Sequence, residues 1–166
     1  MIAKRSPLDL HTFLLIETEY LFTHPKEAVD DISVISNQYE IDIDYKINQD
    51  GETGYQLFVR IEINRDQSLP GYSLLAEGIG IFNFEPSLQL SKGDKFNFLL
   101  YSGISICINS LRSIISTLTA HGPFGKYLLP TIDVTDLIDQ RRERAKQNLK
   151  EKSSKPTKVT RKVKNN

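Results

Sequence analysis

The chain has one cysteine, Cys107, so no internal disulfide can support its fold. The apolar neighbours of this residue, Ile106 and Ile108, predict a buried thiol in a reducing compartment. Polar residues interrupt the N-terminal segment, which argues against the apolar core of a signal peptide. No apolar stretch approaches the ~20 residues that span a membrane. We therefore expect an intracellular, cytoplasmic protein.

Residue patterns typical of catalytic or metal sites are also lacking. His11, His24 and His121 are scattered, and none has a ligand-like spacing to Cys107 or to another histidine. Residues 78–80 begin like a dinucleotide-binding loop, but they lie inside an expected strand and no third glycine follows. No Gly-x4-Gly-Lys-Ser/Thr motif occurs. The sequence predicts no enzymatic activity, no metal and no cofactor.

The formal net charge is zero, but the charges are unevenly distributed. Residues 1–140 carry 10 basic and 19 acidic residues, whereas residues 141–166 carry 11 basic and 2 acidic ones. The sequence predicts one domain at residues 1–150 and a basic, disordered tail at 151–166. The tail is either a solvated extension or a segment attracted to a neighbouring acidic subunit, an anionic membrane or nucleic acid. No aromatic residue is interleaved in it, which argues against nucleic acid as a partner.

Four strands are expected in the first half of the chain. Apolar and polar residues alternate strictly over 40–47, which predicts a strand with one dry and one solvated face. A turn at 49–54 joins it to a second alternating strand at 56–63. Residues 14–22 and 72–84 predict two further strands. The short connections favour antiparallel pairing.

Helices are expected after residue 86. An N-cap at Gly93-Asp94 begins a helix that Gly103 kinks or breaks, and a longer helix continues to about Ala120. Gly122 is expected in the left-handed conformation that ends a helix. A last helix begins near residue 133. Strands followed by helices predict an α+β fold, with helices packed on one face of a four-stranded antiparallel sheet.

The expected fourth strand and long helix hold more apolar surface than one small domain can bury. Ile79 and Ile81 lie on the face opposite Phe82 and Phe84, so the same helices cannot cover both pairs. A second subunit is the simplest cover for the remaining pair. The long helix adds an apolar stripe to the expected oligomer interface. This stripe consists of Leu111, Ile114, Ile115 and Leu118.

Several segments, in this order and spacing, resemble the bacterial export chaperone family SecB. They are a tyrosine-led strand with an internal arginine (55–63), a Gly-Ile-Phe strand (80–82), an arginine-containing helix (111–116) and a Gly-Pro-Phe loop (122–124). The similarity covers roughly residues 13–140. It implies a SecB-like fold and a homotetramer, built as a dimer of dimers through the long helix. It also implies ATP-independent holding of unfolded chains for the export ATPase SecA.

The resemblance assigns Ile41, Ile43 and Tyr45 to a strand whose apolar residues face bound polypeptide. Taken singly, Ile41 and Ile43 are expected in the sheet core rather than on a client surface, whereas Phe58, Leu75 and Tyr101 are expected to be partly exposed. All six are candidate client-binding residues.

Departures from the family pattern at Thr23, at Leu75 and in the basic tail argue against docking of SecA. SecB-like relatives also serve antitoxins of toxin–antitoxin systems. The sequence therefore predicts a holding chaperone for unfolded polypeptides, either preproteins or an antitoxin. The alternative is a nucleic-acid-associated protein that acts through its basic tail.

Overall fold

The computed structural model describes residues 2, 4–28, 32–51 and 54–154, with the side chains described to residue 147. The chain divides into two compact units, Met1–Val134 and Thr135–Asn166. The sequence placed a boundary at residue 150 instead. The predicted disorder of the tail concerns residues that lie mostly outside the described part.

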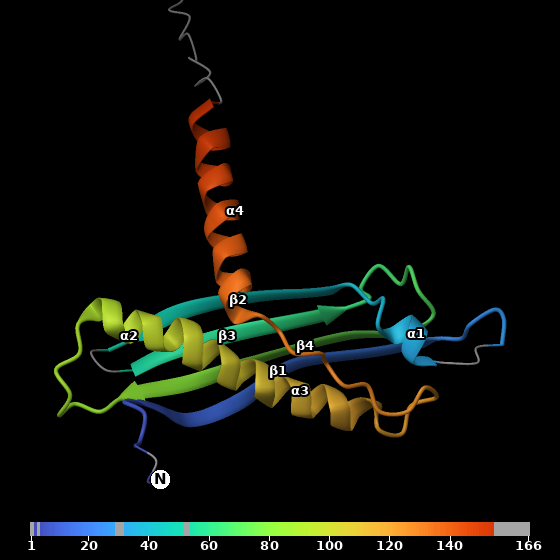
Figure 1. Ribbon diagram of the computed structural model, residues 1–166, viewed down its shortest axis with the longest axis horizontal. Coiled ribbons are helices and arrows are strands. Elements are labelled where there is room, and N and C mark those ends of the chain that lie inside the picture. Colours follow the sequence, from blue (N-terminus) through green and yellow to red (C-terminus); the bar gives the residue numbers. More distant parts are fainter. Residues whose placement is uncertain (1, 3, 29–31, 52–53, 155–166) are drawn as a thin grey trace, which may run out of the picture. The chain divides into compact units, whose positions relative to one another are not determined.

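The first unit contains a four-stranded antiparallel sheet (Figure 1). Its strands are β1 (Leu8–Thr23), β2 (Ile41–Asp50), β3 (Gly54–Ile63) and β4 (Gly71–Phe84), in the spatial order β1-β4-β3-β2. A short helix, α1 (Ile32–Ser36), lies between β1 and β2 in the chain. The sheet and the α+β class are as the sequence predicted. β1, however, begins six residues before the expected start at Leu14.

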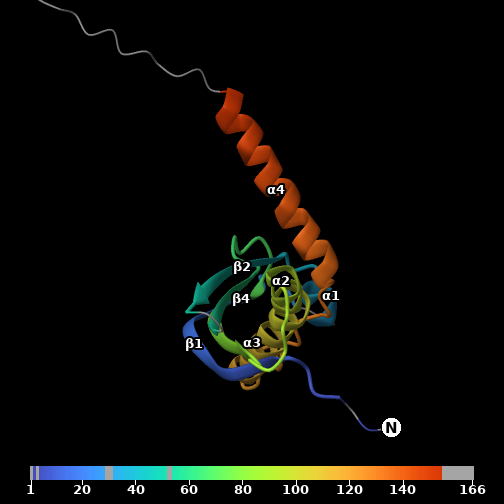
Figure 2. The ribbon, with the colours of Figure 1, turned by 90° about the vertical axis from the view of Figure 1, so that its left-hand side faces the viewer.

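One continuous helical run covers one face of the sheet (Figures 1 and 2). It comprises α2 (Lys92–Phe98), a π-helical turn η1 (Leu99–Gly103) and α3 (Ile104–Thr119). Viewed from one end, the sheet curves around this run. Length and composition alone would allow Lys92–Thr119 to cross a membrane. Its buried side packs on the sheet, as a core helix does.

Three details of this helical run differ from the sequence expectation. The N-cap is Ser91, because its hydroxyl accepts a hydrogen bond of 3.1 Å from the Asp94 amide. Gly103 does not break the helix. A Cβ there would lie 3.2 Å from Leu57 Cδ2, so the glycine allows close packing on β3. The left-handed glycine after α3 is Gly125 (φ +67°) instead of Gly122.

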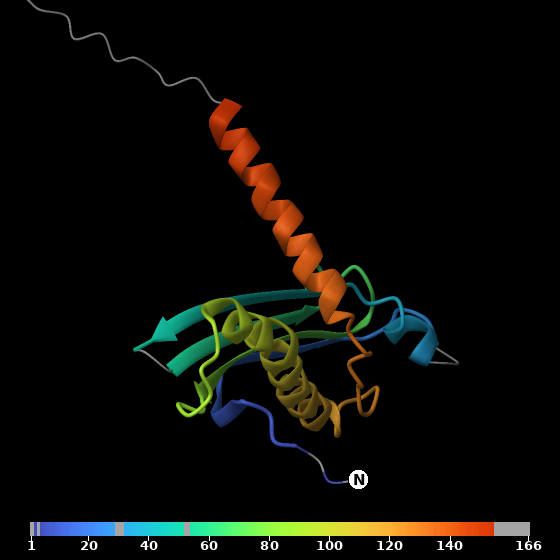
Figure 3. The same ribbon diagram turned by 60° about the vertical axis from the view of Figure 1, so that its left-hand side comes forward.

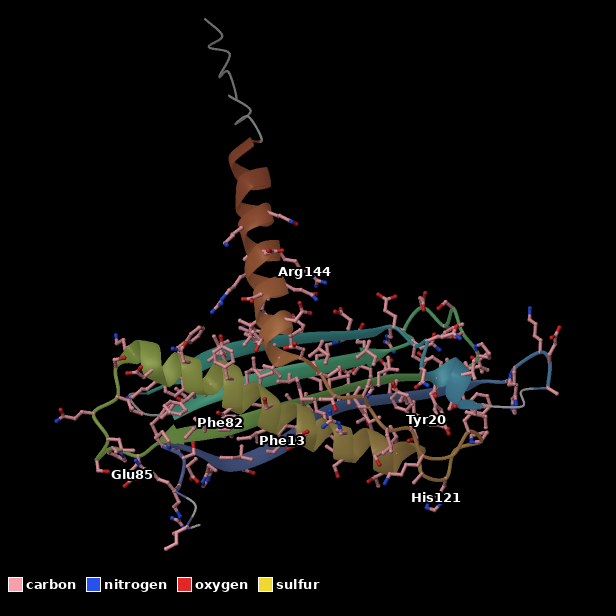
Figure 4. The ribbon with its side chains drawn as sticks, in the orientation of Figure 1. Phe13, Tyr20, Phe82, Glu85, His121 and Arg144 are labelled. Carbon is pink, nitrogen blue, oxygen red and sulfur yellow. The ribbon has the colours of Figure 1, made fainter. Side chains whose placement is uncertain are left out.

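The core lies between the sheet and the helical run. The inward side chains of β3 are completely buried, and each contributes about 1.5–3 kcal/mol of apolar burial. These side chains are Leu57, Val59, Ile61 and Ile63. Phe82 of β4 is also fully buried, and Figure 4 labels it together with Phe13 of the neighbouring strand β1.

The second unit contains the helix α4 (Val134–Ser154). Its first turn carries Asp136, and an ion pair of 3.1 Å joins Arg142 to Asp139 one turn earlier. The early acid and later bases suit the helix dipole, as the sequence indicated.

Candidate functional site

Two of the three expected client-binding residues of β2 belong to the core. Ile43 and Tyr45 are each 8% exposed and Ile41 is half-buried. They are aligned with Ile61, Val59 and Ile63 of β3 respectively, on the helix-covered face. In the described residues β2 forms one edge of the sheet, and at this edge the Tyr45 amide donates a hydrogen bond of 2.9 Å to Asp44 Oδ1.

The other three candidates lie apart from these residues and from one another. Phe58 is half-buried on the open face of the sheet, opposite Ile79. Tyr101 is exposed on η1. Leu75 is only 1% exposed, so the expectation of partial exposure was wrong. It is aligned with Glu19 and Glu62, which hold ion pairs around it.

The expected interface residues divide between two surfaces. Ile79 and Ile81 are half-buried on the open face, as their alternation with Phe82 predicts. On α3, Ile114 is half-buried and Leu118 is 39% exposed. Two members of the stripe are not available to a second subunit. Leu111 and Ile115 are buried in the protomer's own core.

Charges on the open face are organised around Arg60 of β3. Its guanidinium contacts Glu62 at 2.8 Å, Glu77 of β4 at 3.3 Å and Glu17 of β1 at 4.0 Å. The hydrogen bond that Arg60 donates to the Glu62 carboxylate raises the pKa of Arg60 above its usual value. A second pair, Arg65 with Glu19, lowers the pKa of that carboxyl. These partly exposed pairs add little stability individually, but they leave the open face with an excess of acid.

The strand β1 carries the most exposed apolar surface of the sheet. It forms the second sheet edge among the described residues and is 16 residues long. Five large apolar side chains on it are between 39% and 51% exposed. They are Leu14, Leu15, Ile16, Tyr20 and Leu21. Sequence reasoning identified this strand but assigned it no site, although only the three polar residues 17–19 interrupt the run from Leu14 to Phe22.

A cavity of about 760 Å³ lies at the end of the sheet where β1 terminates. It is lined by residues 23–28, by Val34 and Ile35 of α1, and by residues of the β3–β4 connection. Figure 3 shows α1 beside these connections. Sequence reasoning missed this site because its walls come from segments about 40 residues apart. The apolar insert Ile32–Ile35 was the available signal.

Burial governs the chemistry of the single thiol, Cys107. Burial raises the pKa of the Cys107 thiol to about 12, so this group is protonated at neutral pH. No group of three or more potential metal ligands occurs among the residues that the structure describes. What the unit offers instead is exposed apolar surface and two strand edges.

The fold is similar to that of a solved SecB-like chaperone, Mycobacterium tuberculosis Rv1957 in complex with a ChAD peptide from the Rv1956 HigA1 antitoxin. The two chains are 9% identical with a TM-score of 0.59, over 76% of this chain and 91% of that chain. A protein of unknown function from Streptococcus agalactiae matches with a TM-score of 0.40 at 9% identity, over 75% of this chain and 97% of that one. No protein-family model and no curated protein matches. The first likeness establishes a SecB-like fold.

Proposed function

We propose that this protein is an ATP-independent chaperone that holds unfolded polypeptides through apolar surface. The observation that carries the proposal is the row of five exposed apolar side chains on β1, at an open sheet edge of a SecB-like fold. In a protein that acts as a single monomer such an edge would be a liability, because exposed apolar edge strands promote aggregation. The likeness to a chaperone solved with an antitoxin peptide supports a polypeptide partner.

Discrimination of unfolded from folded clients follows from burial alone. Apolar contact yields about 25 cal/mol per Å² of buried surface, and an unfolded chain offers many apolar segments. Ordering of the client offsets much of this gain, so each site binds weakly. Several equivalent sites on one assembly raise the affinity through avidity. Binding of clients in this way needs no nucleotide.

The proposed assembly is a homotetramer, built as a dimer of dimers. Two apolar surfaces support it: the β1 edge, and the exposed side of α3 at Ile114 and Leu118. Pairing of β1 with β1 of a second copy would satisfy the free backbone groups and cover the exposed side chains together. Ile79 and Ile81 extend the same open face.

The proposed client is an antitoxin or another unfolded protein of the cytoplasm. The antitoxin is favoured because the solved chaperone with this fold carries an antitoxin peptide. Delivery to SecA is not favoured, since Leu75 is buried where the family places an acidic contact.

Light scattering of an aggregating client, without ATP, tests the proposal. We expect suppression at near-stoichiometric ratios of protomer to client, and no change when ATP is added. A folded protein of equal charge serves as the control additive. Unchanged aggregation at a several-fold excess of protomer would exclude the holding function.

A further inference from the structure

The open face of the sheet, opposite the helical run, carries a band of carboxylates that crosses all four strands. Residues that are aligned across neighbouring strands share a face of the sheet, and here they form two adjacent rows. One row is Asp44, Arg60, Glu77 and Glu17, and the other is Asp42, Glu62, Leu75 and Glu19. These eight residues are called the acidic band. They comprise six acids, one base and the buried Leu75.

The acidic band places like charges directly opposite each other. Glu77 is aligned with Glu17, and Asp42 is aligned with Glu62. Arg60 shares its single charge among three carboxylates, with contacts of 2.8, 3.3 and 4.0 Å. Like charges in directly opposed positions destabilise a sheet. A partner that brought further positive charge to the band would therefore reduce this repulsion.

An apolar row borders the acidic band on the same face. It consists of Phe58, Ile79 and Leu14, which are aligned across β3, β4 and β1. Phe58 and Ile79 are half-buried and Leu14 is 49% exposed. Among the described residues of the first unit no helix lies over this face, because the helical run covers the other one (Figure 2). Several positive charges with a few apolar side chains would match both parts of the face.

The chain itself contains such a segment at residues 155–166. This segment has five bases and no acid, and Val159 and Val163 lie between the bases in the sequence. The bases are Lys155, Lys158, Arg161, Lys162 and Lys164. The excess of nine acids in residues 1–140 equals the excess of nine bases in residues 141–166. Opposite charges of equal size on every copy favour contact between copies.

We propose that the acidic band of one copy binds residues 155–166 of a second copy. The bases of the segment pair with the carboxylates of the band, and its valines contact the apolar row. Each exposed ion pair contributes little, but an assembly holds the segment at a high effective concentration near the neighbouring face. The link between copies rests on the proposed assembly, whereas the affinity of the band for the segment does not depend on the holding function.

A fluorescent peptide of residues 155–166 tests the affinity. The receptor is the full chain with the five bases of the segment replaced by glutamine, so that its own segment does not compete. We expect binding at low salt that weakens several-fold between about 0.05 M and about 0.3 M salt, because exposed charges are then screened. A peptide with glutamine at the five basic positions should not bind. Equal binding of the two peptides, or no binding of either, would overturn the proposal.

Paired variants of this receptor test the place of binding. Asp42→Asn with Asp44→Asn removes two exposed charges of the acidic band, and asparagine keeps an oxygen that can accept the bond from the Tyr45 amide. We expect binding at least about threefold weaker. The matched control, Asp9→Asn with Glu85→Gln, removes two exposed charges outside the band and should bind as the receptor does. Equal affinities of the two double variants would exclude the band as the site.

Carbodiimide coupling, which joins a carboxylate to a lysine amine in direct contact, tests whether two copies are involved. Unlabelled chains and chains labelled with heavy nitrogen are refolded together and coupled at low salt. We expect peptides that join a lysine of 155–166 in one isotopic form to a carboxylate of the band in the other. Cross-links confined to a single isotopic form would exclude the second copy. The aggregation assay reports on the holding function separately, so either proposal can fail while the other stands.

Discussion

The hydroxyl of Tyr72 on β4 donates a hydrogen bond of 2.7 Å to the carbonyl of Gly125, 53 residues further along the chain. The same hydroxyl accepts a hydrogen bond of 3.1 Å from the Phe124 amide. It thereby ties the loop that follows α3 to the sheet. Gly122 belongs to this contact, because a Cβ there would lie 2.5 Å from the Tyr72 hydroxyl oxygen. A glycine is needed at position 122 because the Tyr72 side chain approaches the backbone closely, and not because the backbone is left-handed there.

Replacement of Tyr72 by phenylalanine should destabilise the protein by about 1–2 kcal/mol, because two backbone groups lose their partner. Urea unfolding measures this change. Tyr101→Phe is the matched control, since Tyr101 is exposed, and it should shift the free energy of unfolding by less than about 0.5 kcal/mol. Equal stabilities of Tyr72→Phe and wild type would show that the hydrogen bonds do not hold the loop.

Arg112 of α3 also binds the loop that follows α3, at residues 129 and 130. Its Nε and Nη2 donate to the carbonyls of Leu129 (3.0 Å) and Pro130 (2.9 Å). Lysine retains the charge but cannot reproduce this two-pronged geometry. Arg112→Lys should therefore cost about 1–2 kcal/mol in urea unfolding. Arg142→Lys on α4, where one exposed ion pair is involved, should cost almost nothing. Equal costs at the two positions would contradict this role of Arg112.

The hairpin of β2 and β3 could be predicted from the sequence because one face is dry and the other is solvated. Ile41 to Ile47 therefore alternate strictly with polar residues, and Leu57 to Ile63 do so except at Phe58. The start of β1 could not be predicted in this way. Register shifts at Leu10/Thr12 and Leu15/Glu17 break its alternation, so the segment from Leu8 does not have the period of a strand.

Sites were harder to predict than elements, since exposure depends on partners distant in sequence. Leu75 lies on the open face, as alternation indicates. It is nevertheless almost completely buried, and its cross-strand neighbours are charged. Leu111 and Ile115 match the pattern of an interface helix, but both are buried in the protomer's own core. The cavity depends on Tyr39 meeting Pro70 across 31 positions, and no local pattern encodes that contact.

Charge placed on the β1 edge should disrupt the proposed assembly. Leu14 and Ile16 are 49% and 51% exposed, so the double change Leu14→Asp and Ile16→Asp should leave the fold intact. Like charges brought together at a shared edge repel, and we expect the mass in solution to fall below that of the wild-type assembly. Light scattering coupled to size-exclusion chromatography measures the mass. Leu128→Asp should leave it unchanged, and an unchanged mass in the double variant would remove β1 from the interface.

Stability should decline in alkaline solution because of Cys107. Burial raises the pKa of its thiol from 9.0 to about 12. The stabilisation is complete below pH 9 and is lost as the pH rises towards 12, because only the unfolded chain releases the proton in that window. The free energy of unfolding should therefore fall by up to about 1.4 kcal/mol per pH unit for this one group. Tyr127, whose pKa burial also raises to about 12, adds to the slope above pH 10.

Urea unfolding of Cys107→Ala between pH 8.5 and pH 10 isolates the thiol, because the free energy of unfolding of this variant should change less with pH than that of the wild type. Parallel curves for the two proteins would show that the thiol ionises as readily in the folded chain as in the unfolded one.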